Sequence, residues 1–161
     1  MGELQKKIDA IMRLVNATTE SERNEAMEEV RRLLDSKPTP DPESIIQSIL
    51  LKIGAPDHLL GHPMVIEGVM LALEDRGYTD SITHRLYPKL AECFDTTAIR
   101  VERDIRHQIE TTWVHGDIDA QEKYFGATIN PNKGKPTNGQ FISRLVNITR
   151  AQLKTAYGVA A

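Results

Sequence analysis

The sequence predicts an all-α protein: a compact multi-helix domain that contains a helix-turn-helix and is preceded by an N-terminal helical hairpin. Apolar residues recur at the three- and four-residue spacing of one helix face through most of the chain. Aromatic residues are sparse, at 5%, whereas charged residues make up 27% of the 161 positions. That balance is typical of amphipathic helices with one buried and one solvated face.

Residues 1–36 are expected to form a hairpin of two amphipathic helices. Thr19 and Glu22 have the spacing of a capping box, which marks the start of the second helix. The apolar stripes are Leu4, Ile8, Ile11 and Val15 in the first helix and Ala26, Val30, Leu33 and Leu34 in the second. Because so small a hairpin cannot bury both stripes by itself, we interpret it as a dimerisation or partner-binding element. A simple helical extension is the alternative.

A proline-rich linker is expected at residues 37–43, and its prolines lie in the stretch Ser36-Lys-Pro-Thr-Pro-Asp-Pro42. Three prolines in so short a span favour an extended, semi-rigid spacer. The main domain, residues 44–161, follows. Its helices are expected near 44–53, 63–76, 86–94, 97–115, 118–124 and 138–156, with Gly54, Gly77, Gly116 and Gly126 as stop signals.

Residues 86–115 have the layout of a DNA-reading helix-turn-helix. Pro88 stands in the first turn of the first helix, where its missing N–H is tolerated. Asp95, Thr96 and Thr97 form the turn, and one of the two threonines can cap the second helix while its hydroxyl lies near a phosphate track. Two helices joined by a turn of three or four residues match the motif in length.

The second helix, residues 97–115, has an apolar arc and a charged arc. The apolar arc comprises Ala98, Val101, Ile105, Ile109 and Thr112; the opposite arc comprises Arg100, Arg103, Arg106, His107 and Glu110. Arginine can donate two parallel hydrogen bonds to guanine, so we predict that Arg100, Arg103 and Arg106 read bases. Glu102 either accepts from a cytosine amino group or restrains a neighbouring arginine. Spacing alone equally permits a solvated, salt-bridged face.

Several motifs in this region resemble a known family. They are Ser81-Ile-Thr, Leu86-Tyr-Pro, Phe94-Asp-Thr-Thr-Ala, Arg100-Val-Glu-Arg, Ile105-Arg-His and Lys135-Pro-Thr-Asn138. The stretch from about Ser44 to about Leu153 resembles the DNA-binding effector domain of the stage-zero sporulation response regulator family of spore-forming bacteria. The resemblance implies an all-helical domain that binds short promoter boxes on double-stranded DNA, usually as two tandem copies. It also implies activation or repression of transcription through bound RNA polymerase.

The resemblance assigns Lys135 to the DNA backbone; without it, a solvated loop is the better interpretation. We predict phosphate contacts for Thr96, Thr97, His107, Lys133 and Lys135. In the family, the segment after the reading helix touches the specificity subunit of RNA polymerase, and here that segment corresponds to residues 115–123. Its acidic residues Asp117, Asp119 and Glu122 are the candidates for contact with a basic partner surface. These three acidic residues are equally typical of ordinary helix N-terminal charges. Asn138 is expected to cap the last helix, which would bury Phe141, Leu145, Ile148 and Leu153.

Some features depart from the family. Ile99 replaces a small polar residue and Asp104 replaces alanine. A carboxylate near DNA repels phosphate, so we expect weaker affinity or an altered preferred box. Family members carry an N-terminal receiver domain, whereas the residues before the match are too few and show no strand pattern. We therefore expect no phosphorylation of this chain in the family manner.

Charge and cysteine content limit the alternatives. The net charge is −3, but residues 1–79 sum to −5 and residues 80–161 to +2, so the basic excess lies with the motif. The single Cys93, expected on the apolar side of its helix, excludes a disulfide scaffold. No apolar run reaches the roughly 20 residues that span a bilayer, and we expect no signal peptide. We expect a cytoplasmic protein with no membrane contact.

The sequence offers little for other chemistry. His58 and His62 have the spacing of a metal pair, but Gly61 and Pro63 interrupt the helix that would align them, and no third ligand follows. There is no nucleophile elbow and no glycine-rich phosphate loop. We expect no metal, no cofactor and no enzymatic activity.

Together these features predict a sequence-specific transcription regulator that places residues 97–115 in the major groove. A homodimer or heterodimer, formed through the N-terminal hairpin or on DNA, is expected. One alternative is a receiver-less interaction module that pairs with or antagonises a full-length regulator. Another is a DNA-binding subunit regulated by a ligand at the hairpin, although no residue identifies such a ligand.

Overall fold

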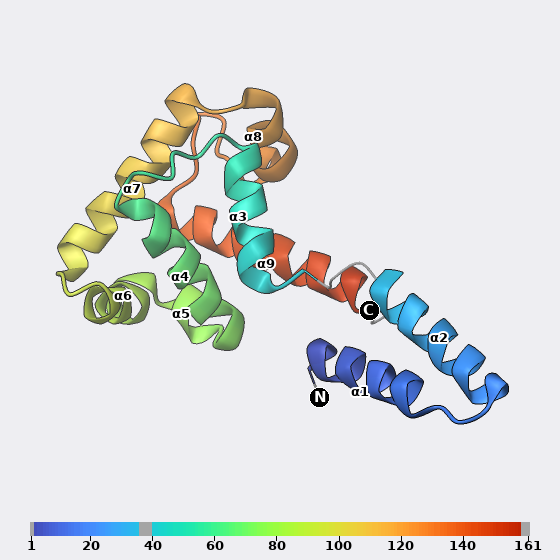
Figure 1. The fold of residues 1–161 in the computed structure, drawn as a ribbon. Coiled ribbons are helices and arrows are strands. Elements are labelled where there is room, and N and C mark those ends of the chain that lie inside the picture. Colours follow the sequence, from blue (N-terminus) through green and yellow to red (C-terminus); the bar gives the residue numbers. More distant parts are fainter. Residues whose placement is uncertain (1, 36–39, 159–161) are drawn as a thin grey trace. The chain divides into compact units, whose positions relative to one another are not determined.

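The computed structural model describes residues 2–35 and 40–158. The chain divides into two compact units, Met1–Thr39 and Pro40–Ala161. Within the described ranges every regular element is a helix, which confirms the all-α class (Figure 1). None of these helices is long and apolar enough to cross a membrane.

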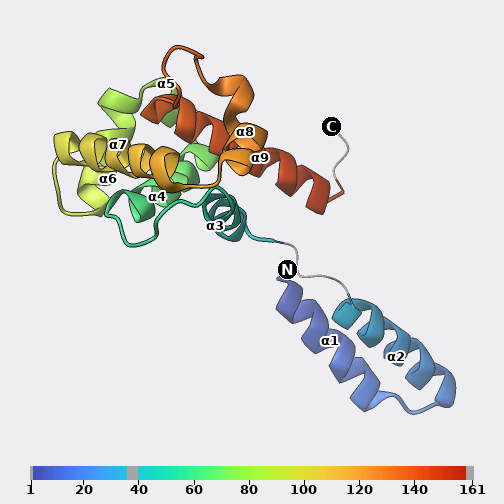
Figure 2. The same ribbon diagram turned by 90° about the horizontal axis from the view of Figure 1, so that it is seen from above.

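The first unit is the predicted hairpin. α1 (Glu3–Asn16) and α2 (Glu20–Asp35) lie side by side and antiparallel in both views of Figures 1 and 2. The capping box forms: the Glu22 backbone N–H donates to Thr19 Oγ1 at 3.2 Å, and the Thr19 N–H donates to Glu22 Oε2 at 3.1 Å. The backbone N–H groups of Thr18 and Thr19 hold the pKa of Glu22 below its usual value.

The second unit contains the remaining helices. They are α3 (Pro42–Lys52), α4 (Gly61–Glu74), α5 (Gly77–Asp80), the π-helical turn η1 (Ile82–Leu86), α6 (Tyr87–Cys93), α7 (Ala98–His115), α8 (Ile118–Phe125), the 3-10 turn η2 (Gly126–Thr128) and α9 (Asn138–Ala156). α5 and η1 were not predicted, because elements of four or five residues are too short to show a hydrophobic period.

Two helix starts differ from the prediction. Residues 37–39 of the expected linker lie outside the described residues, and Pro42 and Glu43 belong to α3 rather than to a spacer. Asp41 caps α3 by accepting from the Ser44 N–H at 2.9 Å, and proline is tolerated in a first turn because its N–H is not needed there. For the same reason α4 begins at Gly61, two residues before Pro63.

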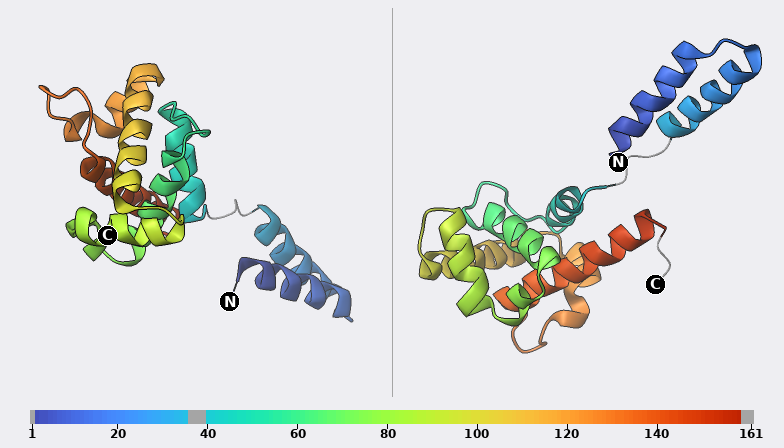
Figure 3. Two further views of the ribbon diagram at one scale, coloured as in Figure 1. Left: turned by 90° about the vertical axis from the view of Figure 1, so that its left-hand side faces the viewer. Right: turned by 90° about the horizontal axis from the view of Figure 1, so that it is seen from below.

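The core of the second unit lies where α4, α7 and α9 pack on one another (Figures 1 and 3). Three aromatic rings fill it near α8: Trp113 stands edge-on to Phe125 and Phe141, with centroids 5.4 and 5.9 Å away, and those two rings stack at 5.0 Å. α3 and α6 cover the remaining sides of α4. Cys93 is exposed, contrary to expectation, because it is the last residue of the short α6.

The backbones of α4 and α7 meet at Gly61. A Cβ atom added there would lie 2.2 Å from the backbone oxygen of Asp104 and 2.8 Å from Gln108 Cβ. Gln108 is fully buried, and its Nε2 donates to the Pro56 carbonyl at 2.9 Å. These contacts fix the rotation of α7 against the rest of the unit.

We expect Gly61→Ala to destabilise the second unit by about 1–3 kcal/mol, because the added methyl group must displace backbone rather than a flexible side chain. Gly68→Ala in the same helix is the matched control. Its Cβ would lie 3.4 Å from Leu90 Cδ1, an ordinary contact, and alanine favours helix, so stability should stay equal or rise. Urea unfolding followed by circular dichroism measures both, and equal losses would contradict the account.

Candidate nucleic-acid interface

The helix-turn-helix consists of α6, a turn at residues 94–97 and α7. The Thr96 N–H donates to the Ala91 carbonyl at 3.0 Å, and Asp95 adopts the left-handed conformation, with φ 49°. Thr97 caps α7, since its Oγ1 accepts from the Arg100 N–H at 3.3 Å. Both threonines therefore lie at the start of α7, and Thr97 is the residue that caps it.

The two faces of α7 separate largely as predicted. Val101, Ile105, Ile109 and Thr112 are buried, Gln108 joins them, and Ala98 is only partly buried. Arg100, Arg103, Arg106 and His107 are exposed. Ile99 is also exposed, at 81%, beside the arginines, a position that the sequence analysis did not assign to the site.

The charged side chains of α7 differ in their pairing. Arg106 contacts Glu102 through its guanidinium, whereas Arg103 Nε lies 3.8 Å from Asp104 Oδ1, a loose contact. Arg100 has no ion-pair partner among the described residues. Surface pairs of this kind contribute little to stability, so the guanidinium groups can exchange partners readily.

Asp104 lies at the edge of this face rather than on it. Its side chain is only 18% exposed, and its backbone oxygen faces the start of α4.

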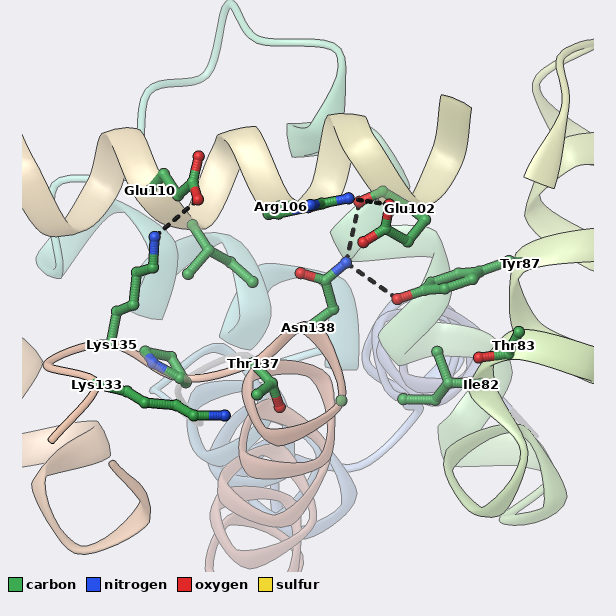
Figure 4. Close-up of a pocket in the computed structure, with 13 residues that line it drawn as sticks. Ile82, Thr83, Tyr87, Glu102, Arg106, Glu110, Lys133, Lys135, Thr137 and Asn138 are labelled. Carbon is green, nitrogen blue, oxygen red and sulfur yellow. Dashed lines mark hydrogen bonds and ion pairs between the residues drawn. The ribbon is translucent and has the colours of Figure 1, made fainter. Parts of the chain in front are cut away.

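The loop before α9 brings a lysine to α7. Lys135 Nζ lies 2.7 Å from Glu110 Oε1, and this neighbouring cation holds the pKa of Glu110 below its usual value (Figure 4). A pocket of about 540 Å³ lies between α7, η1 and this loop. Lys133 is exposed on the same loop and also lines the pocket.

Asn138 does not cap α9. Thr137 does, in a capping box with Gln140, and the Thr137-x-x-Gln140 pattern would have indicated this from the sequence. Asn138 Nδ2 instead donates to the Tyr87 hydroxyl and to the Glu102 carbonyl, each at 3.0 Å (Figure 4). Burial raises the pKa of Tyr87, which keeps its hydroxyl neutral. One side chain thus joins α6, α7 and α9 behind the arginines.

The acidic group lies on α8, at the other end of α7 from α6 (Figure 1). Asp117 caps α8 by accepting from the Ala120 N–H at 2.7 Å. Asp119 and Glu122 are exposed, next to Ile118, which is 76% exposed. The structure therefore separates these three residues from the arginine face.

His58 and His62 do not form a metal pair in one helix, because His58 precedes α4 and His62 lies in its first turn. Burial lowers the pKa of His62. In the described part of the chain no three His, Cys, Asp or Glu residues are placed to hold a metal ion.

An arginine-bearing helix that projects from a helix-turn-helix, braced on its buried side, defines a DNA-binding domain of the transcription-regulator class. The model of the family "Sporulation initiation factor Spo0A C terminal" matches residues 46–148, from the second turn of α3 to the third turn of α9. The chain belongs to this family. It is a DNA-binding domain of a transcription regulator, a class with no enzymatic activity, and its partner is DNA.

We expect Asn138→Ala to lower the free energy of unfolding of the second unit by about 1–3 kcal/mol, because it leaves the Glu102 carbonyl and the Tyr87 hydroxyl without their donor. Asn147→Ala, at an exposed position of the same helix, is the control and should change stability little. Thermal unfolding measures both. Indistinguishable stabilities would show that the junction is not a constraint on α7.

Proposed function

We propose that residues 97–110 of α7 enter the major groove and that Arg100 and Arg103 read base edges there. Their exposure on the face of α7 opposite the core supports this proposal, as does their weak pairing within the protein. A guanidinium that holds no strong partner loses little when it transfers its hydrogen bonds to guanine O6 and N7.

Glu102 and Arg106 take a supporting role. Because Arg106 is paired with Glu102, it reaches DNA only by exchanging that partner for a base or a phosphate. The Glu102 carboxylate can then accept from a cytosine amino group or continue to restrain Arg106.

We propose that the DNA backbone is held on both sides of this helix. Thr96 and Thr97 stand at its start, His107 on its exposed face, and Lys133 and Lys135 on the loop beside Glu110. Hydroxyl, imidazole and ammonium groups donate to phosphate oxygens without reading sequence. In the complex a phosphate would take the place of Glu110 as the partner of Lys135.

For RNA polymerase, we propose that α8 presents Asp119 and Glu122 to a basic surface of the specificity subunit. The exposure of both carboxylates and of the neighbouring Ile118 supports this. The carboxylate of Asp117 already accepts from the backbone of α8, so it positions that helix rather than meeting the partner.

The variant Arg103→Ala tests base reading. We expect a loss of about 1–3 kcal/mol on the preferred duplex, obtained by selection from a random library, and relaxed preference at one base pair. Arg103→Lys keeps the charge but not the planar fork, so it should lose specificity while retaining affinity for random DNA. Fluorescence anisotropy measures both. Equal losses on preferred and scrambled duplexes would overturn the base-reading role.

Substitutions of Lys135 and of its partner Glu110 should change the affinity for DNA in opposite directions. Lys135→Ala should weaken binding to all sequences alike and reduce the slope of log affinity against log salt by about 1. Glu110→Gln should raise affinity for all sequences, because it removes a competitor of phosphate and releases the lysine. Lys154→Ala, near the far end of α9, is the control and should change neither quantity. A changed base preference in Lys135→Ala would refute the phosphate assignment.

A further inference from the structure

The hairpin of α1 and α2 carries an exposed apolar surface outside the matched family segment. Thirteen large hydrophobic side chains are exposed among the described residues, and seven of them lie in this short unit. They are Leu4, Ile8, Ile11, Met12 and Val15 in α1 and Met27 and Leu34 in α2, each between 44% and 72% exposed. Ala10 and Ala26 are the buried hydrophobic residues of the hairpin. Its own packing therefore leaves most of its apolar side chains in water.

Six of these side chains gather on one side of the hairpin. α1 contacts α2 along the edge that holds Ala10, and the Leu4-Ile8-Ile11-Val15 stripe lies roughly 100–160° from that edge, whereas Met12 lies outside the stripe. In α2, Met27 and Leu34 lie roughly 100° from the edge that holds Ala26, in the same rotational sense. Because the two helices run antiparallel (Figure 2), the same rotation in both brings the two stripes to the same side. We call this surface the apolar face.

The opposite side of the hairpin is polar. There Arg13 of α1 and Glu29 of α2 form an ion pair of 3.0 Å. On each helix the charged residue lies roughly 60° from the edge that contacts the other helix, on the side away from the apolar stripe. The hairpin thus has the cross-section of half a four-helix bundle, with one apolar side and one solvated side. The interior of a four-helix bundle forms when the apolar sides of two such hairpins pack together.

Area and charge favour another copy of the same surface as the covering partner. The six side chains of the apolar face, each 44–72% exposed, present on the order of 600 Å² of apolar surface, which approaches the roughly 800 Å² per partner of a stable interface. Residues 1–35 carry eight acidic and six basic groups, so an anionic lipid surface is a poor match. When the apolar faces of two copies pack on each other about a two-fold axis, each face covers the other and no apolar surface stays exposed.

We infer that the chain forms a homodimer in which the apolar faces of two hairpins pack together as a four-helix bundle. This dimer brings two DNA-binding units together without any contact between those units. It is independent of how α7 reads DNA, since no residue of the second unit takes part.

Sedimentation velocity of the full chain, without DNA, tests the inference. We expect dimers at micromolar concentration and monomers for the double variant Ile8→Glu with Ile11→Glu, which places four carboxylates in the bundle interior. The matched control is Leu51→Glu with Leu60→Glu, two side chains of the second unit that are 79% and 71% exposed, and it should remain dimeric. A monomeric wild-type chain up to about 100 µM, or a dimeric Ile8/Ile11 variant, overturns the inference.

A second variant separates loss of the interface from loss of helix. Ile8→Ala with Ile11→Ala keeps or raises helix propensity while it removes apolar area, so we expect helicity to persist and the dimer dissociation constant to rise at least about tenfold. An unchanged dissociation constant contradicts the assignment of the interface. The same variant should bind a single DNA box as the wild type does but lose avidity on two adjacent boxes, by at most the factor by which the dimer dissociation constant rises.

Discussion

The contact between the first turn of α4 and the backbone of α7 determines which side of α7 meets solvent. It is a backbone contact, made possible because Gly61 has no side chain, and it stands next to the buried amide of Gln108. On the other flank, Asn138 holds the Glu102 carbonyl. A helix fixed on both flanks cannot rotate, so Arg100 and Arg103 face outward in every molecule. Preorganisation of this kind reduces the free energy lost on binding.

On the exposed face of α7, the carboxylates of the protein and the phosphates of DNA would compete for the same lysine and arginine side chains. Glu110 holds Lys135, and Glu102 holds Arg106. In water these pairs are weak, and the counterions released from DNA favour the exchange toward phosphate at low salt. In the proposed complex, the carboxylates would lower general affinity for DNA more than affinity for a site that also offers matched base edges. The proposal thus assigns them a role in specificity.

The long helices, some of their ends and the helix-turn-helix could be predicted, because each follows from local signals: apolar periodicity, capping residues, and glycine after a last turn. Gly54, for example, has φ 74° directly after α3 and its cap, as expected for a stop signal. What could not be predicted depends on contacts between distant residues. The role of Asn138 requires Tyr87, 51 positions away, and the burial of Gln108 requires Pro56. The pair of Glu102 and Arg106, by contrast, has the i, i+4 spacing of one helix face and follows from the sequence.

The central claim is that arginines of α7 read guanine edges in the major groove. Replacing guanines of the preferred duplex one at a time by 7-deazaguanine removes the N7 acceptor and leaves the base pair intact. Titrating each duplex with the wild-type chain and with Arg103→Ala forms a double-mutant cycle. We predict one guanine whose replacement weakens wild-type binding but leaves the binding of Arg103→Ala unchanged. Equal losses for both proteins at every guanine would contradict base reading by Arg103, and no loss at any guanine would contradict the assignment of α7 as the reading helix.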